Sequence, residues 1–138
     1  MSLPDQPSEL LKLALNDLIQ VENDPRYDIN MGEWHYPRET ACSVCLAGAV
    51  MAGTLDADPG EELSPEDFEQ SNDAWKLYAL DSARWGDWDE FLKELGLDLH
   101  APDELFEELP TVCRYDVDPE QFKADIRQAI DVLNRYSY

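Results

Sequence analysis

The sequence predicts a mainly α-helical protein, a single compact domain of four to five helices around a buried central helix at about residues 41–55. Three observations lead to this prediction. The chain has 138 residues, the size of one domain, so residues 1–138 should share one core. Several segments repeat apolar residues every three or four positions. Proline stands at the first position of several of these segments, directly after a residue that can cap a helix.

The first helix and the segment after it differ in pattern. The helix is expected to begin at Pro7, and its leucines then recur at helical spacing over about four turns. The next segment contains Pro25, Gly32 and Pro37, which interrupt this periodicity. Its alternating apolar residues fit either a short β-hairpin near residues 27–36 or an irregular loop.

The central helix is predicted from the least polar stretch of the chain. Every residue from Val44 to Ala52 is apolar or glycine. A helix over about Ala41 to Leu55, capped by Thr40, would have no polar face, so the other helices should enclose it. The segment from Val44 to Met51 is therefore expected to be buried.

Four later segments carry the start signals of helices. They begin after Ser64, after Asp87, between Pro102 and Pro110, and after Asp118. The first of them is expected to run to about Arg84, and the second should stop at Gly96.

The charge balance restricts the kinds of partner. The chain has 31 acidic and 10 basic residues, a formal net charge of −21 and an isoelectric point near 4.1. A field of this sign repels nucleic acid and anionic membranes, and it attracts cations and basic proteins. The composition therefore argues against direct binding of DNA or RNA.

The negative charge is concentrated between Asp56 and Glu108, where 18 acidic and 3 basic residues give a net charge of −15. Three explanations are open: adaptation to a cytoplasm of high salt, imitation of nucleic-acid phosphates by a DNA-mimic inhibitor, and a solvated surface without a partner. The candidate partner-binding residues are Glu61, Glu62, Glu66, Asp67, Glu69, Asp73, Asp87, Asp89, Glu90, Glu94, Asp103, Glu104, Glu107 and Glu108.

These features favour a non-enzymatic protein that binds a basic protein surface, such as that of a nucleic-acid-handling protein. The sequence has no glycine-rich phosphate loop and no serine nucleophile motif, and it suggests neither a catalytic residue nor a cofactor. No apolar run is long enough to span a bilayer, and the first residues do not resemble a signal peptide, so a cytoplasmic location is expected. The oligomeric state stays open.

Cys42 and Cys45 form a Cys-x-x-Cys pair at the start of the predicted central helix. Redox enzymes use this arrangement because a helix N-terminus favours a thiolate. The negative field and the lack of a convincing preceding strand favour a packing role instead. The alternative function is thiol chemistry or zinc binding, for which Cys113, His35 and His100 are further candidate ligands.

Two segments are loosely similar to known sites. The stretch TACSVCLAGA resembles the helix-borne Cys-x-x-Cys of papain-like peptidases, which would pair Cys45 with His100. Ser43 and Leu46 stand where that family has glycine and an aromatic residue. The acidic segment from Asp56 to Asp67 resembles a calcium loop, but its glycine comes one position too early.

Aromatic residues cluster in GEWHYPRE and ARWGDWDE, two segments outside the long predicted helices. The members are Trp34, His35, Tyr36, Trp85 and Trp88. Such residues can line a pocket, but in a domain of this size they more often close the ends of the core.

The block CSVCLAGAVMAGTL, with GEWHYP before it and WGDWDEFLKEL after it, resembles uncharacterised small acidic proteins of phages and prophages. The resemblance covers about Gly32 to Leu95 and implies no activity. It implies a source in a mobile element, where small acidic proteins that present a DNA-like charge surface to nucleases are a known type.

Overall fold

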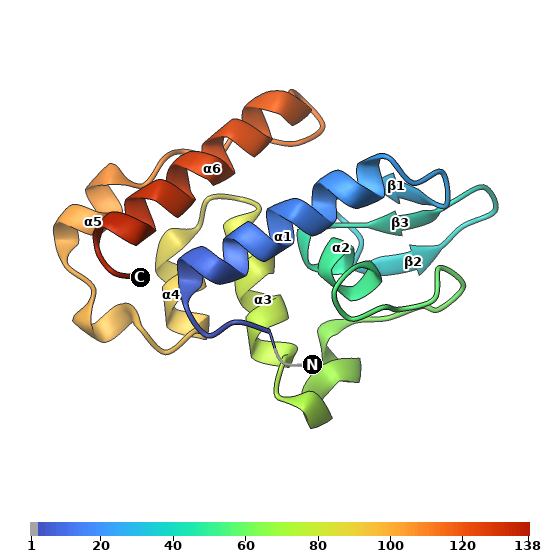
Figure 1. Cartoon of the computed structure of the whole chain (residues 1–138), viewed down its shortest axis with the longest axis horizontal. Helices are drawn as coiled ribbons and strands as arrows, with labels where there is room; N and C mark the ends of the chain where they lie inside the picture. Colours follow the sequence, from blue (N-terminus) through green and yellow to red (C-terminus); the bar gives the residue numbers. More distant parts are fainter. Residues whose placement is uncertain (1–2) are drawn as a thin grey trace.

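Helices make up most of the regular structure in the computed structural model, which describes residues 3–138 (Figure 1). In chain order the elements are α1 (Pro7–Glu22), β1 (Tyr27–Ile29), β2 (His35–Pro37), β3 (Cys42–Val44), α2 (Leu46–Ala52), the 3-10 helix η1 (Pro65–Ser71), α3 (Ala74–Ala83), α4 (Trp88–Glu94), the 3-10 helix η2 (Asp98–His100), α5 (Asp103–Glu108) and α6 (Pro119–Arg135). This mainly α architecture with one small sheet confirms the predicted fold class.

The three strands form one sheet in the order β1-β3-β2. β3 pairs in parallel with β1 and antiparallel with β2. The extended segments expected near residues 27–36 are therefore present as β1 and β2. The predicted hairpin is wrong, because β3 lies between these two strands in the sheet. The sheet stands at the right-hand end of the molecule in Figure 1.

The predicted helix over 41–55 is instead a strand followed by a short helix. Residues 42–44 bond to neighbouring strands on both sides, for example through the N–H of Cys42, which donates to the carbonyl oxygen of Arg26 at 2.8 Å. A short apolar run gives the same sequence pattern in a buried strand as in a buried helix, so periodicity did not separate the two. The N-cap of α2 is Cys45, and Thr40 is exposed.

Burial of the central segment is confirmed. Every residue from Val44 to Met51 is buried, and α2 packs against α1, α3, β2 and β3. The helix reaches the sheet closely at Gly48, where a Cβ atom would lie 1.6 Å from the carbonyl oxygen of Trp34. Gly48 therefore permits the contact between α2 and the segment before β2.

The single helix expected from Ser64 to Arg84 is divided into η1 and α3. Asn72 lies between them in the left-handed region, at φ 62°, and it ends the first helical segment. Asparagine tolerates this conformation better than most residues, but it gives no clear break in an apolar periodicity. The capping box at Ser64 and Asp67 is present.

The remaining helix predictions are confirmed. The Asp87 carboxylate accepts the N–H of Glu90 at the start of α4, and the Asp118 carboxylate accepts the N–H of Gln121 at the start of α6. Gly96 takes φ 72° just after α4, as a helix stop does. Helix α6 packs along α1, which crosses the middle of the molecule (Figure 1).

Candidate functional site

Most of the predicted binding carboxylates are at the surface. Glu90 and Glu94 are half-buried and Asp73 is fully buried. The exposed members are Glu61, Glu62, Glu66, Asp67, Glu69, Asp87, Asp89, Asp103, Glu104, Glu107 and Glu108. Burial raises the pKa of Glu94, and the neighbouring Glu90 carboxyl adds to the effect.

The prediction that Asp73 belongs to the binding surface is wrong, because this residue is buried and binds the backbone near the N-terminus. Its Oδ1 accepts the N–H of Leu3 at 3.1 Å. The Nζ of Lys76 donates to the carbonyl oxygen of Leu3 at 2.5 Å and pairs with Asp5 at 2.8 Å. One carboxylate oxygen of Asp73 is thus bound by the backbone of Leu3, while the buried Oδ2 has no hydrogen-bond partner among the described residues.

The exposed carboxylates are mostly uncompensated by basic side chains. Within residues 3–138, Glu108 is the one predicted binding residue that forms an ion pair, with Arg135 at 3.0 Å. The other exposed members have no lysine or arginine within ion-pair distance in the described part of the chain. Like charges at this density repel one another, so a basic partner would relieve the repulsion.

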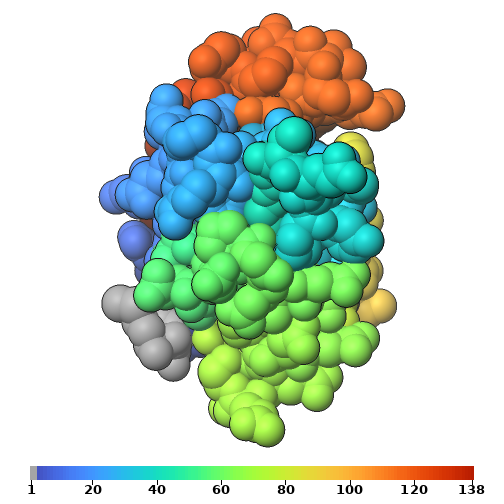
Figure 2. Space-filling view, turned by 90° about the vertical axis from the view of Figure 1, so that its right-hand side faces the viewer, coloured from blue at the N-terminus to red at the C-terminus, as the bar shows by residue number. Residues whose placement is uncertain are grey.

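These carboxylates come from different parts of the molecule. Helix α5 lies at the left-hand end in Figure 1, whereas η1 projects from the lower edge, nearer the sheet. In the side view of Figure 2, the segment around residues 60–75 forms the lower part of one face, directly beneath the strands. The acidic residues therefore lie on or just before three helical segments, η1, α4 and α5.

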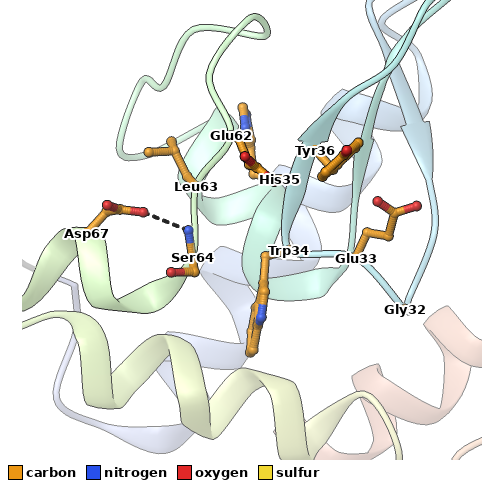
Figure 3. Close-up of a pocket in the computed structure, with 9 residues that line it drawn as sticks. All are labelled: Gly32, Glu33, Trp34, His35, Tyr36, Glu62, Leu63, Ser64 and Asp67. Atoms are coloured by element: carbon orange, nitrogen blue, oxygen red, sulfur yellow. Dashed lines mark hydrogen bonds between the residues drawn. The ribbon is translucent and has the colours of Figure 1, made fainter.

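A groove lies where the start of η1 meets the sheet (Figure 3). Its volume is about 450 Å³, and it is lined by Gly32, Glu33, Trp34, His35, Tyr36, Glu62, Leu63, Ser64 and Asp67. The N–H of Leu63 donates to the carbonyl oxygen of His35 at 2.9 Å and joins the two walls. The N–H of Ser64 donates to Asp67 at 2.8 Å, which fixes the start of η1.

Two of the candidate metal ligands lie side by side, but they form no larger cluster. His35 is buried, its Nδ1 lies 2.7 Å from the carbonyl oxygen of Glu61, and it is 3.6 Å from the Sγ of Cys42. Cys113 is half-buried near α6, and its N–H donates to Asp125. Among the described residues, no group of three or more Cys, His, Asp or Glu side chains is arranged to hold a metal ion.

Both thiols of the Cys-x-x-Cys pair are buried, and burial raises the pKa of each to about 11. Cys42 lies in β3, and Cys45 accepts the N–H of Gly48 through its Sγ at 3.4 Å. The prediction that both cysteines start the central helix is therefore wrong for Cys42, which lies in a strand, and Cys45 alone caps the helix. A protonated, enclosed thiol is a poor nucleophile at neutral pH.

The thiols should therefore react unequally with a thiol reagent. At pH 7.5, we expect Cys113 to react in the native protein while Cys42 and Cys45 stay protected, and all three to react after unfolding. Their raised pKa values also predict a stability that is complete below about pH 9 and falls as the pH rises towards 11, because the unfolded chain releases these protons first. Fast native reaction of all three thiols would contradict this prediction.

The two loose similarities gain no support from the structure. His100 is exposed in η2, just before α5, whereas Cys45 is buried beside the sheet at the other end of the molecule (Figure 1). In the acidic loop, Asp58 accepts the N–H of Gly60 at 2.8 Å, and Glu61 accepts the N–H of Asp58 at 3.2 Å. These carboxylates stabilise the turn of the loop itself.

The sequence indicated only some of the residues that line the groove. Trp34 and Tyr36 belong to the noted aromatic cluster, but the residues opposite them lie nearly thirty positions further along the chain. The other aromatic segment behaves as expected only in part: Trp88 is buried and its indole N–H donates to the carbonyl oxygen of Pro110, whereas Trp85 is exposed and lies beneath the guanidinium of Arg84. The bonds of His35 to Glu61 and Leu63 bring the two walls together.

No helix in the described part of the chain is both long and apolar enough to cross a bilayer. No protein-family model, curated protein or solved structure matches the chain.

Proposed function

We propose that the protein is a non-enzymatic interaction protein whose acidic surface binds a basic surface of another protein in the cytoplasm. The observation that supports this proposal most is the set of exposed carboxylates on η1, α4 and α5, which, apart from Glu108, form no ion pair among the described residues. A field of one sign accelerates encounter with a partner of the opposite sign and disfavours other partners.

A nucleic-acid-handling protein is the partner class that fits this charge best. Such proteins carry lysine and arginine side chains placed to neutralise phosphates, and a surface rich in unpaired carboxylates competes for those side chains. DNA would then compete with this protein for the same basic surface.

The proposal is tested by measuring binding to a panel of purified nucleic-acid-handling proteins, with an acidic protein of similar size as the negative control. We expect binding at about 50 mM salt that weakens at least about tenfold at about 200 mM, and that duplex DNA displaces. Undetectable binding to the whole panel at low salt would overturn the proposal. A large gain in stability at molar salt without any binding would favour salt adaptation instead.

Two charge-matched variants locate the binding group. One replaces Glu61, Glu66 and Glu69 with glutamine, and the other replaces Asp103, Glu104 and Glu107 with the corresponding amides. Both variants remove three negative charges from exposed positions, so the net charge of the protein changes by the same amount in each. A stronger loss of affinity in one variant assigns the contact to that group.

A further inference from the structure

We propose that the groove between β2 and η1 binds an arginine side chain of the basic partner. This inference rests on the proposed function and names the point of contact. It follows from three features of the groove: its charge, its aromatic walls and its rigid frame.

The charge of the groove is negative and only partly compensated. Its lining contains the carboxylates of Glu33, Glu62 and Asp67 and no lysine or arginine. Glu33 pairs with Arg38, and one oxygen of Asp67 accepts the N–H of Ser64. Glu62 is exposed and has no ion pair within the described part of the chain, so a cation in the groove would meet a free carboxylate.

Tyr36 and Glu33 already hold a guanidinium from the same chain, which a partner's arginine would displace from this part of the groove. Arg38 lies over the ring of Tyr36, 5.1 Å from its centroid, while it pairs with Glu33. The same three-part arrangement recurs where Arg84 lies 4.1 Å from the ring centroid of Trp85 and pairs with Asp81. A ring face beside a carboxylate matches the flat guanidinium of arginine better than the compact ammonium of lysine.

Trp34 supplies the second aromatic surface and is firmly placed. Its ring meets Tyr78 edge to face at a centroid distance of 5.9 Å, and its backbone lies against Gly48 of α2. In Figure 3, its indole points towards the helix below, away from Tyr36, with Asp67 and Glu33 on opposite sides. A preformed wall limits the ordering cost of binding, and a volume of about 450 Å³ is within the range of ligand clefts.

The test uses a fluorescein-labelled peptide with three arginines separated by glycines, and the same peptide with lysines. We expect Glu62→Gln to weaken binding of the arginine peptide about fivefold and Tyr36→Leu about threefold, with Tyr36→Phe close to wild type because it keeps the ring. The matched control is Glu104→Gln, which removes one charge from an exposed position of α5 and should change binding less than about twofold. The lysine peptide should bind several times more weakly.

NMR provides a readout that depends on position. During titration with the arginine peptide, the indole N–H signal of Trp34 should shift, and that of Trp88, which donates to Pro110 within the core, should stay. Equal losses for Glu62→Gln and Glu104→Gln, with an unmoved Trp34 signal, would overturn the groove as the contact while leaving the proposed function standing. Failure of the wild type to bind any basic protein or peptide would overturn both.

Discussion

Gly48→Ala should lower the free energy of unfolding by about 3 kcal/mol, at the upper end of the usual cost of overpacking. The new Cβ would lie 1.6 Å from the carbonyl oxygen of Trp34 and 2.8 Å from the carbonyl carbon, so the backbone of α2 or of residue 34 must move. Backbone cannot rotate out of the way as a flexible side chain can. Urea denaturation followed by circular dichroism measures the change.

Gly60→Ala is the control for this substitution. Gly60 is exposed in the acidic loop, and its closest neighbour to a new Cβ is a side-chain oxygen of Asp58 at 3.3 Å. We expect a change below about 1 kcal/mol, because alanine also restricts the unfolded chain. Similar losses at both positions would show that Gly48 makes no special contact. Since Trp34 forms one wall of the groove, Gly48→Ala should also weaken binding of the arginine peptide.

The sequence predicted the helix starts that carry a capping aspartate well and the sheet poorly, for physical reasons. Helix starts at Asp87 and Asp118 depend on local hydrogen bonds within four residues, so the residue types alone reveal them. The strand of residues 42–44 depends on partners at residues 27–29 and 35–37. Pairing of this kind depends on the path of the chain in three dimensions, which no local pattern records.

The same division holds for the candidate site. Net charge is additive, so the sequence alone revealed the acidic surface. Whether a single carboxylate is buried depends on its surroundings in the fold, which composition does not reveal. Asp73 has the same side chain as exposed Asp67, yet it is buried and accepts a hydrogen bond from the backbone of Leu3, seventy positions away. The groove likewise needs the contact of His35 with Leu63. The negative charge of the surface was predictable from the sequence, but the aromatic groove within this surface was not.

Lys123→Met should lower the free energy of unfolding by about 3 kcal/mol, the lower end of the range for breaking a buried ion pair. The Nζ of Lys123 lies 2.9 Å from Glu22 and 3.3 Å from Glu120, and its side chain is only 10% exposed. It joins the end of α1 to the start of α6. Without it, Glu22 would keep a largely buried charge beside Asp28 and Glu120, two further carboxylates of the same surface hollow.

The pH dependence of this effect has a definite sign. The hydrogen bond that Lys123 donates to Glu22 raises the pKa of Lys123 above its ordinary value of 10.5. The stabilisation by the ammonium is therefore complete below about pH 10 and is lost as the pH rises through the higher pKa of the folded state. The difference in unfolding free energy between wild type and Lys123→Met should thus be constant from pH 6 to about pH 9 and should shrink above it.

Lys93→Met separates the ion pair from the general effect of charge. Lys93 is exposed on α4 and forms no ion pair among the described residues, so its loss makes the net charge equally more negative. We expect a cost below about 0.5 kcal/mol there. Glu22→Gln in the Lys123→Met background should recover much of the stability, because it removes the unpaired charge, and the double-mutant cycle then gives the coupling energy. Equal losses of stability at the two lysines would mean that each positive charge acts through the overall field of this acidic chain. A larger loss at Lys123 would mean that the position of this lysine beside Glu22 decides its contribution.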